Sequence, residues 1–412
     1  MATLFNNIGL LVNAREEYSL IRGKSLGELP VIENAYLVIE EEDIVEYGPM
    51  SACKYSPSSF EFNEDCTGKY LLPSWCDSHT HLVFAGSREN EFTDRIKGLS
   101  YAEIAARGGG ILNSAKKLNQ TSEKELFRQS SARLQEVIQL GTGAIEIKSG
   151  YGLTVQGELK MLRVIKRLKE CFKIPIKATF LAAHSYPEEY RNHHEAYIDL
   201  IINEMLPIIS KDKLADYIDV FCEKGFFSPE ETEKICKAGI SQGLKPRIHA
   251  NQLGLSGGVQ KGVQLNAISV DHLEHMDDET IEILSGSSTI GTLLPTAAFF
   301  LREPYPPARK MIEKDCSISI ASDYNPGSSP SGNMNFVLSL ACIHMGLLPA
   351  EAINAATLNG AHAMEVADIV GSITVGKKAN LIITKKVPSL AYLPYAFGSN
   401  LLDKVMLMGE WI

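Results

Sequence analysis

The fold is decided by the stretch Tyr70-Leu71-Leu72-Pro73-Ser74-Trp75-Cys76-Asp77-Ser78-His79-Thr80-His81, an apolar run that ends in a polar segment with two histidines. Comparable short runs recur between about residues 70 and 325 and alternate with longer helical patterns. This alternation is typical of repeated βα units around a parallel sheet. The eight runs are Tyr70 to Cys76, Thr142 to Ile147, Ile176 to Ala182, Tyr217 to Phe221, Pro246 to His249, Ala267 to Val270, Ser288 to Leu293 and Ser317 to Ala321. Eight successive units predict an α/β fold, a closed (β/α)8 barrel of the TIM type.

The two ends of the chain carry short β-type segments outside this pattern. They are Tyr36-Leu37-Val38-Ile39 and Ile44-Val45 near the start, and Asn380-Leu381-Ile382-Ile383 and Lys404-Val405-Met406-Leu407-Met408 near the end. Neither end has enough strands for a stable sheet alone, because a sheet of few strands is marginal. We therefore expect residues 1–69 and 371–412 to form one small composite β-domain of the sandwich type, and residues 70–370 to form the barrel.

Composition narrows the class of protein and of partner. Of the 412 residues, 45% are hydrophobic and 22% are charged, which are ordinary globular values, and no apolar run reaches the length of a membrane span. The net charge of -10 is spread along the chain, without the basic clusters that nucleic-acid binding needs. The eight cysteines form no CxxC pair, and the first residues lack the features of a secretory signal. We expect a cytoplasmic protein that acts on a small molecule, not on a membrane or a nucleic acid.

Five ionisable residues follow or end four of the eight barrel runs. His79 and His81 are two positions apart, so their side chains point to the same face. His249 ends the fifth run, His272 follows the sixth, and Asp323 follows the eighth. Active-site residues of a (β/α)8 barrel collect at these carboxyl ends, and imidazole with carboxylate suits zinc or iron. The sequence therefore predicts a metal site.

The fourth run bears on the number of metal ions. It reads Tyr217-Ile218-Asp219-Val220-Phe221-Cys222, with no lysine at its end to be carbamylated and no further set of carboxylates. We expect one divalent or trivalent ion, not two.

Three further residues near the expected site suit a small polar ligand. Arg88 follows the first run, Tyr151 follows the second and His184 follows the third. A guanidinium group can hold a carboxylate through two hydrogen bonds. These residues favour a substrate with an acidic tail.

Longer strings of sequence carry a resemblance. Those common to a superfamily are Asp77-Ser78-His79-Thr80-His81-Leu82, Asp323, Asn354-Ala355-Ala356-Thr357-Leu358-Asn359, Gly371-Ser372-Ile373 and Gly376-Lys377-Lys378-Ala379-Asn380-Leu381. The rarer ones are Arg88-Glu89-Asn90-Glu91-Phe92, Tyr101-Ala102-Glu103-Ile104, Glu146-Ile147-Lys148-Ser149-Gly150-Tyr151-Gly152-Leu153 and Ser322-Asp323-Tyr324-Asn325-Pro326-Gly327-Ser328. With these strings the chain resembles, over essentially its whole length, the imidazolonepropionases, a family of the amidohydrolase superfamily that acts in histidine degradation.

The resemblance implies an activity and a set of site residues. The reaction would be hydrolysis of the ring C–N bond of 4-imidazolone-5-propanoate to N-formimidoyl-L-glutamate, in a homodimer. The metal ligands would be His79, His81, His249 and Asp323. The substrate contacts would be Arg88, Tyr101, Tyr151 and His184, with Asn325, Gly327 and Ser328 at the acid end. Asp323 would also transfer protons, and His272 would stabilise the oxyanion.

One residue departs from the pattern of the family. Many members carry an acidic residue three positions after the histidine that corresponds to His249, where this chain has Gln252. A neutral amide can bind substrate but cannot take up a proton at neutral pH. Asp323 is the remaining carboxylate with suitable placement for the general base.

Two alternatives stay open at this stage. The first is an aminohydrolase that releases ammonia from a purine- or pterin-like ring, since the metal set and the attacking water would be the same. The second is a scaffold that has lost catalysis, which the departure at Gln252 keeps in view.

Overall fold

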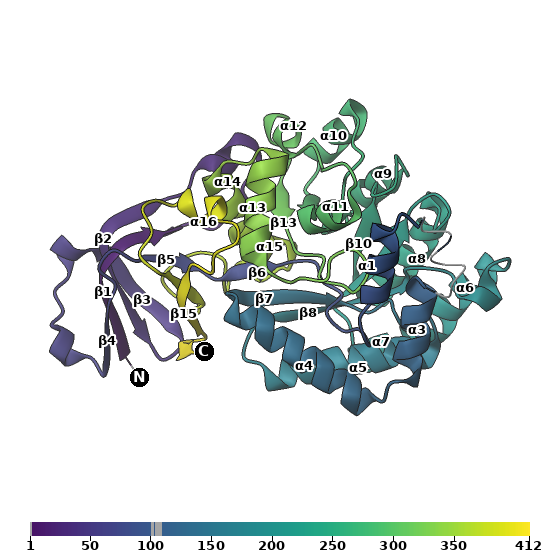
Figure 1. Cartoon of the computed structure of the whole chain (residues 1–412), viewed down its shortest axis with the longest axis horizontal. Coiled ribbons are helices and arrows are strands. Elements are labelled where there is room, and N and C mark those ends of the chain that lie inside the picture. The colour runs from purple at the N-terminus through teal and green to yellow at the C-terminus, as the bar shows by residue number, and fades with distance from the viewer. Residues whose placement is uncertain (1, 100–102, 104–108) are drawn as a thin grey trace.

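The computed structural model describes residues 2–99, 103 and 109–412, and its largest element is a parallel barrel (Figure 1). Neighbouring strands pair in chain order from β6 to β13, and a parallel bridge between Thr80 and Tyr324 joins the last strand to the first. The strands are β6 (Trp75–Asp77), β7 (Thr142–Lys148), β8 (Ile176–Ala183), β9 (Tyr217–Cys222), β10 (Lys245–Ala250), β11 (Ser269–His272), β12 (Ile290–Leu293) and β13 (Ile318–Ile320). The predicted (β/α)8 barrel is confirmed.

Helices cover the outside of the barrel, and the longer ones bury apolar side chains against it. Leu162 and Ile165 of α5, for example, belong to the same apolar cluster as Ile145 of β7. The helices are α1 (Glu89–Ile96), α3 (Ile111–Gln120), α4 (Glu123–Gln139), α5 (Val155–Cys171), α6 (His194–Leu200), α7 (Leu206–Lys211), α8 (Pro229–Ser241), α9 (Gly258–Gln264), α10 (Asp278–Ser285), α11 (Pro295–Leu301), α12 (Ala308–Glu313), α13 (Met334–Met345), α14 (Pro349–Ala356), α15 (Leu358–Ala363) and α16 (Tyr392–Tyr395). Within the described ranges, none of them combines the length and the apolar character that a membrane crossing requires.

A second sheet is built from both ends of the chain, beside the barrel (Figure 1). Its strands are β1 (Ala2–Val12), β2 (Val31–Glu40), β3 (Asp43–Pro49), β4 (Phe62–Asp65), β5 (Tyr70–Pro73), β14 (Leu381–Thr384), β15 (Leu402–Leu407) and β16 (Glu410–Trp411). Strand β5 links the two ends, since it pairs in parallel with β1 and antiparallel with β14. Phe5, Leu37 and Ile383 share one buried apolar cluster. The expected small β-domain from both termini is therefore present.

The first predicted strand, Tyr70 to Cys76, is two strands. The part up to Pro73 is β5 of the terminal sheet, and the barrel begins at Trp75. The change of partner falls at Ser74, whose N–H donates to Asn380 O, while the N–H of Trp75 donates to Gly141 O. Pro73 has no N–H to give to either sheet, so the chain can turn from one to the other at this point. Pro73 and Ser74 interrupt the apolar run at this point, but the sequence analysis treated the run as one strand.

Candidate metal centre and active site

The five ionisable residues expected at the carboxyl ends of the strands lie together and are buried. His79 and His81 follow β6, His249 lies in β10, His272 ends β11 and Asp323 follows β13. Each is at most 2% exposed. Within the described residues, two groups of three possible ligands have donor atoms within 4.8 Å of one another, and both contain His79. One group adds His81 and His249, and the other adds His272 and Asp323.

The ring nitrogens of this cluster converge on a common space. His249 Nε2 lies 3.4 Å from His81 Nε2, and Asp323 Oδ1 lies 3.6 Å from His79 Nε2 and 3.5 Å from His81 Nε2. Burial holds the pKa of His79 and of His81 well below the usual value, so both rings are neutral. His79 Nε2 is buried and has no hydrogen-bond partner among the described residues. Neutral imidazole nitrogens and a carboxylate oxygen that face one common space are the ligands that a single cation requires.

Two aspartates behind the histidines set the orientation of the rings. Asp271 Oδ2 lies 2.7 Å from His79 Nδ1, and Asp219 Oδ2 lies 3.0 Å from His249 Nδ1. A carboxylate on one ring nitrogen fixes the tautomer and directs the other nitrogen at a metal. This outer arrangement is what a metal-binding histidine normally has.

Asp323 is held by the loop that follows it. Its Oδ2 accepts hydrogen bonds from Asn325 Nδ2 at 2.8 Å and from Ser328 Oγ at 2.9 Å, which leaves Oδ1 toward the histidines. Burial raises the pKa of Asp323 to about 6. Its φ is 52°, in the left-handed region that non-glycine residues rarely adopt. Backbone held in this region is common where a loop presents a functional side chain.

His272 carries a carboxylate partner of its own. Its Nδ1 lies 3.2 Å from Glu274 Oε1, and its backbone is also left-handed, with φ at 86°. Burial alone would lower the pKa of His272, but Glu274, with smaller contributions from Asp323 and Asp271, raises it to about 9. The neighbouring carboxylates therefore favour the protonated form of His272, in which both ring nitrogens donate hydrogen bonds.

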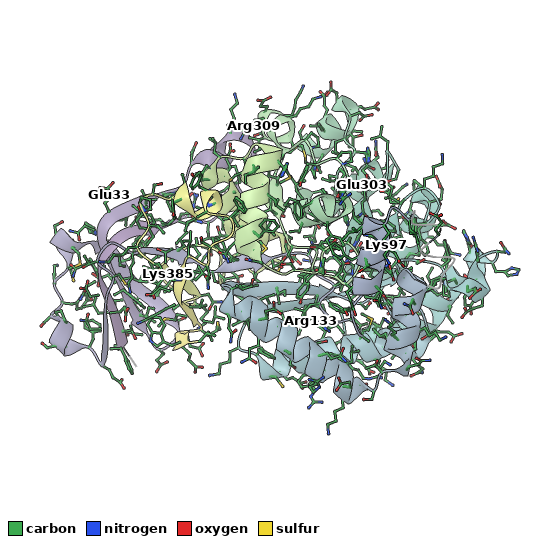
Figure 2. All side chains as sticks on the ribbon, in the orientation of Figure 1. Glu33, Lys97, Arg133, Glu303, Arg309 and Lys385 are labelled. Atoms are coloured by element: carbon green, nitrogen blue, oxygen red, sulfur yellow. The ribbon has the colours of Figure 1, made fainter. Side chains whose placement is uncertain are left out.

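A cavity of about 490 Å³ opens next to this cluster. His184 lines this cavity and stacks on His81, with ring centroids 5.1 Å apart. Glu303, labelled in Figure 2, also contributes to the lining. The cavity brings together seven residues that the sequence predicted for substrate binding, which are Arg88, Tyr151, His184, Gln252, Asn325, Gly327 and Ser328. The eighth, Tyr101, lies outside the described residues.

The side chain of Arg88 is held in place by Glu91. Its Nε and Nη2 donate to Glu91 Oε2 at 2.9 and 2.6 Å, and Glu91 Oε1 accepts from the N–H of Gly110 at 2.9 Å. A Cβ atom built on Gly327 would lie 2.3 Å from Arg88 Nη1. The guanidinium thus packs against the backbone of residue 327, at a distance that only glycine permits.

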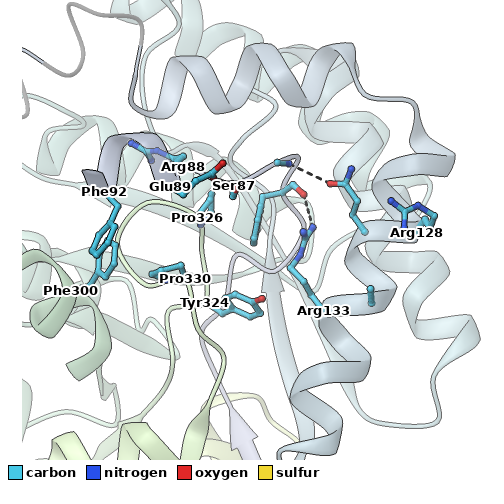
Figure 3. A pocket seen from close by; sticks show the side chains of 14 residues that line it. Ser87, Arg88, Glu89, Phe92, Arg128, Arg133, Phe300, Tyr324, Pro326 and Pro330 are labelled. Atoms are coloured by element: carbon cyan, nitrogen blue, oxygen red, sulfur yellow. Dashed lines mark hydrogen bonds between the residues drawn. The ribbon is translucent and has the colours of Figure 1, made fainter. Parts of the chain in front are cut away.

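A larger cavity of about 740 Å³ also has Arg88 in its wall (Figure 3). Phe92 and Phe300, whose stacked rings are 5.5 Å apart, Tyr324 and Arg133 belong to its wall. The smaller cavity is the candidate active site, because His184 in its wall stacks on His81, and Asn325 and Ser328 in its wall donate to Asp323 Oδ2.

Several residues of the site were missed by the sequence analysis. Asp219 was noted only as part of the fourth run and Asp271 was not singled out, although Asp271 directly precedes His272 and Asp219 lies three positions before the end of β9. Glu223 is 3% exposed, and its Oε1 accepts from the N–H of Gln252 at 2.6 Å. Burial raises the pKa of Glu223 to about 7. The alternation of Asp219, Phe221 and Glu223 along one face was the signal that could have identified them.

Comparison with known proteins places the chain in a family. The model of the amidohydrolase family matches residues 70–412. The chain is 57% identical over 413 residues to the imidazolonepropionase of Flavobacterium johnsoniae, and the match covers 100% of both chains. It is 42% identical to the imidazolonepropionase of Clostridium tetani, over 94% of this chain and 93% of that one.

Solved structures show the same fold at low sequence identity. A triazine hydrolase variant superposes with a TM-score of 0.74 at 14% identity, over 100% of this chain and 94% of that one. An adenosine deaminase from Xanthomonas campestris with bound zinc superposes with a TM-score of 0.70 at 15% identity, over 99% and 92%. The family match over the barrel and the full-length relatives lead to one conclusion: the chain belongs to the amidohydrolase family and, within it, to the imidazolonepropionases.

Proposed function

We propose that this chain hydrolyses 4-imidazolone-5-propanoate to N-formimidoyl-L-glutamate. The single observation that carries the proposal is one cavity that adjoins the histidine cluster and is also lined by Arg88. Three histidines and an aspartate suit hydrolysis at a ring carbonyl, and a guanidinium suits the propanoate tail. The full-length relatives named imidazolonepropionase support the same substrate.

His79, His81, His249 and Asp323 would hold one metal ion, zinc or iron. When bound, such an ion lowers the pKa of water from 15.7 to about 7 and polarises a carbonyl oxygen. Zinc is supported by the zinc-bound adenosine deaminase of the same fold. Iron suits the same ligands equally well, so metal analysis of the protein decides between them.

The protein's own groups would divide the work of ring opening. Arg88 would hold the propanoate through its Nη1 edge, which faces Gly327, and the neutral Gln252 would bind the ring through its amide. Asp323 would take the proton of the attacking water and return it to the ring nitrogen as the C–N bond breaks. The imidazolium of His272 would donate to the oxygen of the carbonyl as negative charge develops there. The carbonyl carbon ends as a carboxyl group, which balances the addition of one water.

We also propose a cellular location and an oligomeric state. All eight cysteines are free thiols, which is typical of a reducing compartment, and we propose a cytoplasmic location. A homodimer, the commonest assembly of soluble enzymes, stays a prediction that a sedimentation measurement can test.

The test is loss of the ultraviolet absorbance of freshly generated 4-imidazolone-5-propanoate, with the metal content measured on the same preparation. We expect rapid loss that a chelator abolishes and that added metal restores. Bound metal without turnover of this compound would contradict the proposal. Ammonia release from aminated heterocycles in the same preparation would instead support the aminohydrolase alternative.

A further inference from the structure

A buried cluster of five charged side chains lies beneath the histidines. They come from four strands of the barrel and are at most 1% exposed. The members are Glu146 and Lys148 of β7, Asp219 of β9, Arg247 of β10 and Asp271 of β11. None of them is among the residues that line the substrate cavity. The cluster therefore has a task other than contact with substrate.

Lys148 connects the two aspartates that orient the histidines. Its Nζ lies 2.9 Å from Asp219 Oδ2 and 3.6 Å from Asp271 Oδ2. These are the same two oxygens that face His249 Nδ1 and His79 Nδ1. One ammonium group thus contacts the partners of two imidazoles that lie on different strands.

The two aspartates do not depend on Lys148 to the same degree. Asp271 has a second cation, since Arg247 Nη2 lies 3.3 Å from its Oδ2 and also donates to Ser78 O at 2.8 Å. Asp219, in contrast, forms an ion pair with Lys148 and with no other lysine or arginine among the described residues. Removal of Lys148 would therefore free Asp219 and the ring of His249 more than Asp271 and the ring of His79.

We propose that Lys148 is a positioning residue of the metal site, which holds Asp219 and Asp271 so that His249 and His79 present their Nε2 atoms together. Outer groups that orient metal ligands change metal affinity by about 10- to 100-fold when they are lost. The ammonium acts by charge and geometry, through a hydrogen bond to Asp219 and an ion pair with Asp271, and exchanges no proton in this role. The proposal rests on the metal site of the proposed function, but not on its substrate.

The test is metal affinity of the purified full-length protein without substrate. Lys148→Met removes the charge and keeps the length of the side chain, and we expect zinc to bind about 10- to 100-fold more weakly in a chelator competition. The visible spectrum of the cobalt-loaded protein should change as well, because the ligand field reports the orientation of the imidazoles. Unchanged affinity and spectrum would overturn the proposal.

Lys377→Met is the matched control. Lys377 is also buried, at 2% exposed, but its Nζ donates to Val370 O and Ser372 Oγ. The control should lower the melting temperature without a change in metal affinity. Equal weakening of metal binding in both variants would show general loosening of the fold and would overturn the role of Lys148.

Two further variants cover the case in which Lys148→Met does not fold. Lys148→Gln keeps an N–H donor without the charge, and Asp219→Asn removes the carboxylate through which Lys148 acts. We expect each to weaken metal binding, and the double variant K148Q/D219N to bind no more weakly than Asp219→Asn alone. Losses that add in the double variant would mean that Lys148 does not act through Asp219. Because no substrate is used, failure of the assigned reaction would leave these measurements unaffected.

Discussion

Gly327→Ala tests whether the position of Arg88 governs recognition of the substrate's carboxylate. A Cβ at residue 327 would lie 2.3 Å from Arg88 Nη1 and 3.0 Å from its Cζ, far inside van der Waals contact. The guanidinium cannot simply withdraw, because Glu91 holds its other edge at 2.6 and 2.9 Å. It must shift by about 1 Å, and a misplacement of that size can cost about 100-fold in rate. Hydrogen bonds to charged groups are worth about 1.5–3 kcal/mol, which is roughly 10- to 150-fold in affinity.

We therefore expect kcat/KM of Gly327→Ala to fall roughly 10- to 100-fold, mainly through KM, since the reacting atoms lie at the other end of the substrate. The assay is steady-state hydrolysis of 4-imidazolone-5-propanoate, and of 4-imidazolone without the propanoate chain. The second compound should be hydrolysed equally by both proteins. Gly286→Ala is the control, because its nearest heavy atom is 3.6 Å away and its φ is -76°. An equal loss on both compounds, or none on the acid, would refute the reasoning.

The other predictions concern charged groups around the expected metal ligands. His272→Ala should lower kcat much more than it raises KM, whereas equal effects on both would argue against an oxyanion role. Glu274→Gln should move the alkaline limb of the kcat profile to lower pH, because Glu274 helps to raise the pKa of His272 to about 9, and an unmoved limb would contradict this. The pKa of Glu223 is raised from 4.5 to about 7, so its contribution to stability is complete below pH 4.5 and is lost as the pH rises through 7. Glu223→Gln should therefore gain stability relative to the parent between pH 5.5 and pH 8 in urea unfolding, and a constant difference would contradict this.

The barrel could be predicted because its signal is local and repeated. Each strand from β7 to β13 lies within about two residues of an apolar run, since strands buried on both faces need such runs. The division at Ser74 could not be predicted, because it depends on Asn380 O and Gly141 O, which lie far away in the sequence. Local pattern shows that a residue is buried in a sheet, but not which of two sheets accepts its N–H.

The candidate site was predictable to the same extent. His79 and His81 were recognisable because residues two apart at a strand end share a face, and the strand ends identified His249, His272 and Asp323. The hydrogen bonds of Asn325 and Ser328 to Asp323 were not recognisable from the sequence. Both residues were expected only at the acid end of the substrate, whereas in the structure their side chains donate to Asp323 Oδ2. They line the cavity as well, so contact with substrate stays a proposal. Sequence identifies the groups that reach a barrel mouth, but hydrogen bonds among them are decided by rotamers.

In the proposed mechanism Gln252 is a neutral residue that would bind the ring without taking part in proton transfer. The carboxylate of Glu223 accepts a hydrogen bond from the backbone N–H of Gln252, and Glu223 is not among the described residues that line the cavity. Glu223 therefore fixes the backbone that presents the amide, while the amide itself offers one donor and one acceptor group to a ring that has both. Proton transfer then needs a second group, and Asp323 has an oxygen toward the histidines and a pKa that burial raises to about 6. In the proposed mechanism ring binding and proton transfer would be carried by different residues, so a substitution of Gln252 by a neutral residue should affect KM more than the pH dependence of kcat.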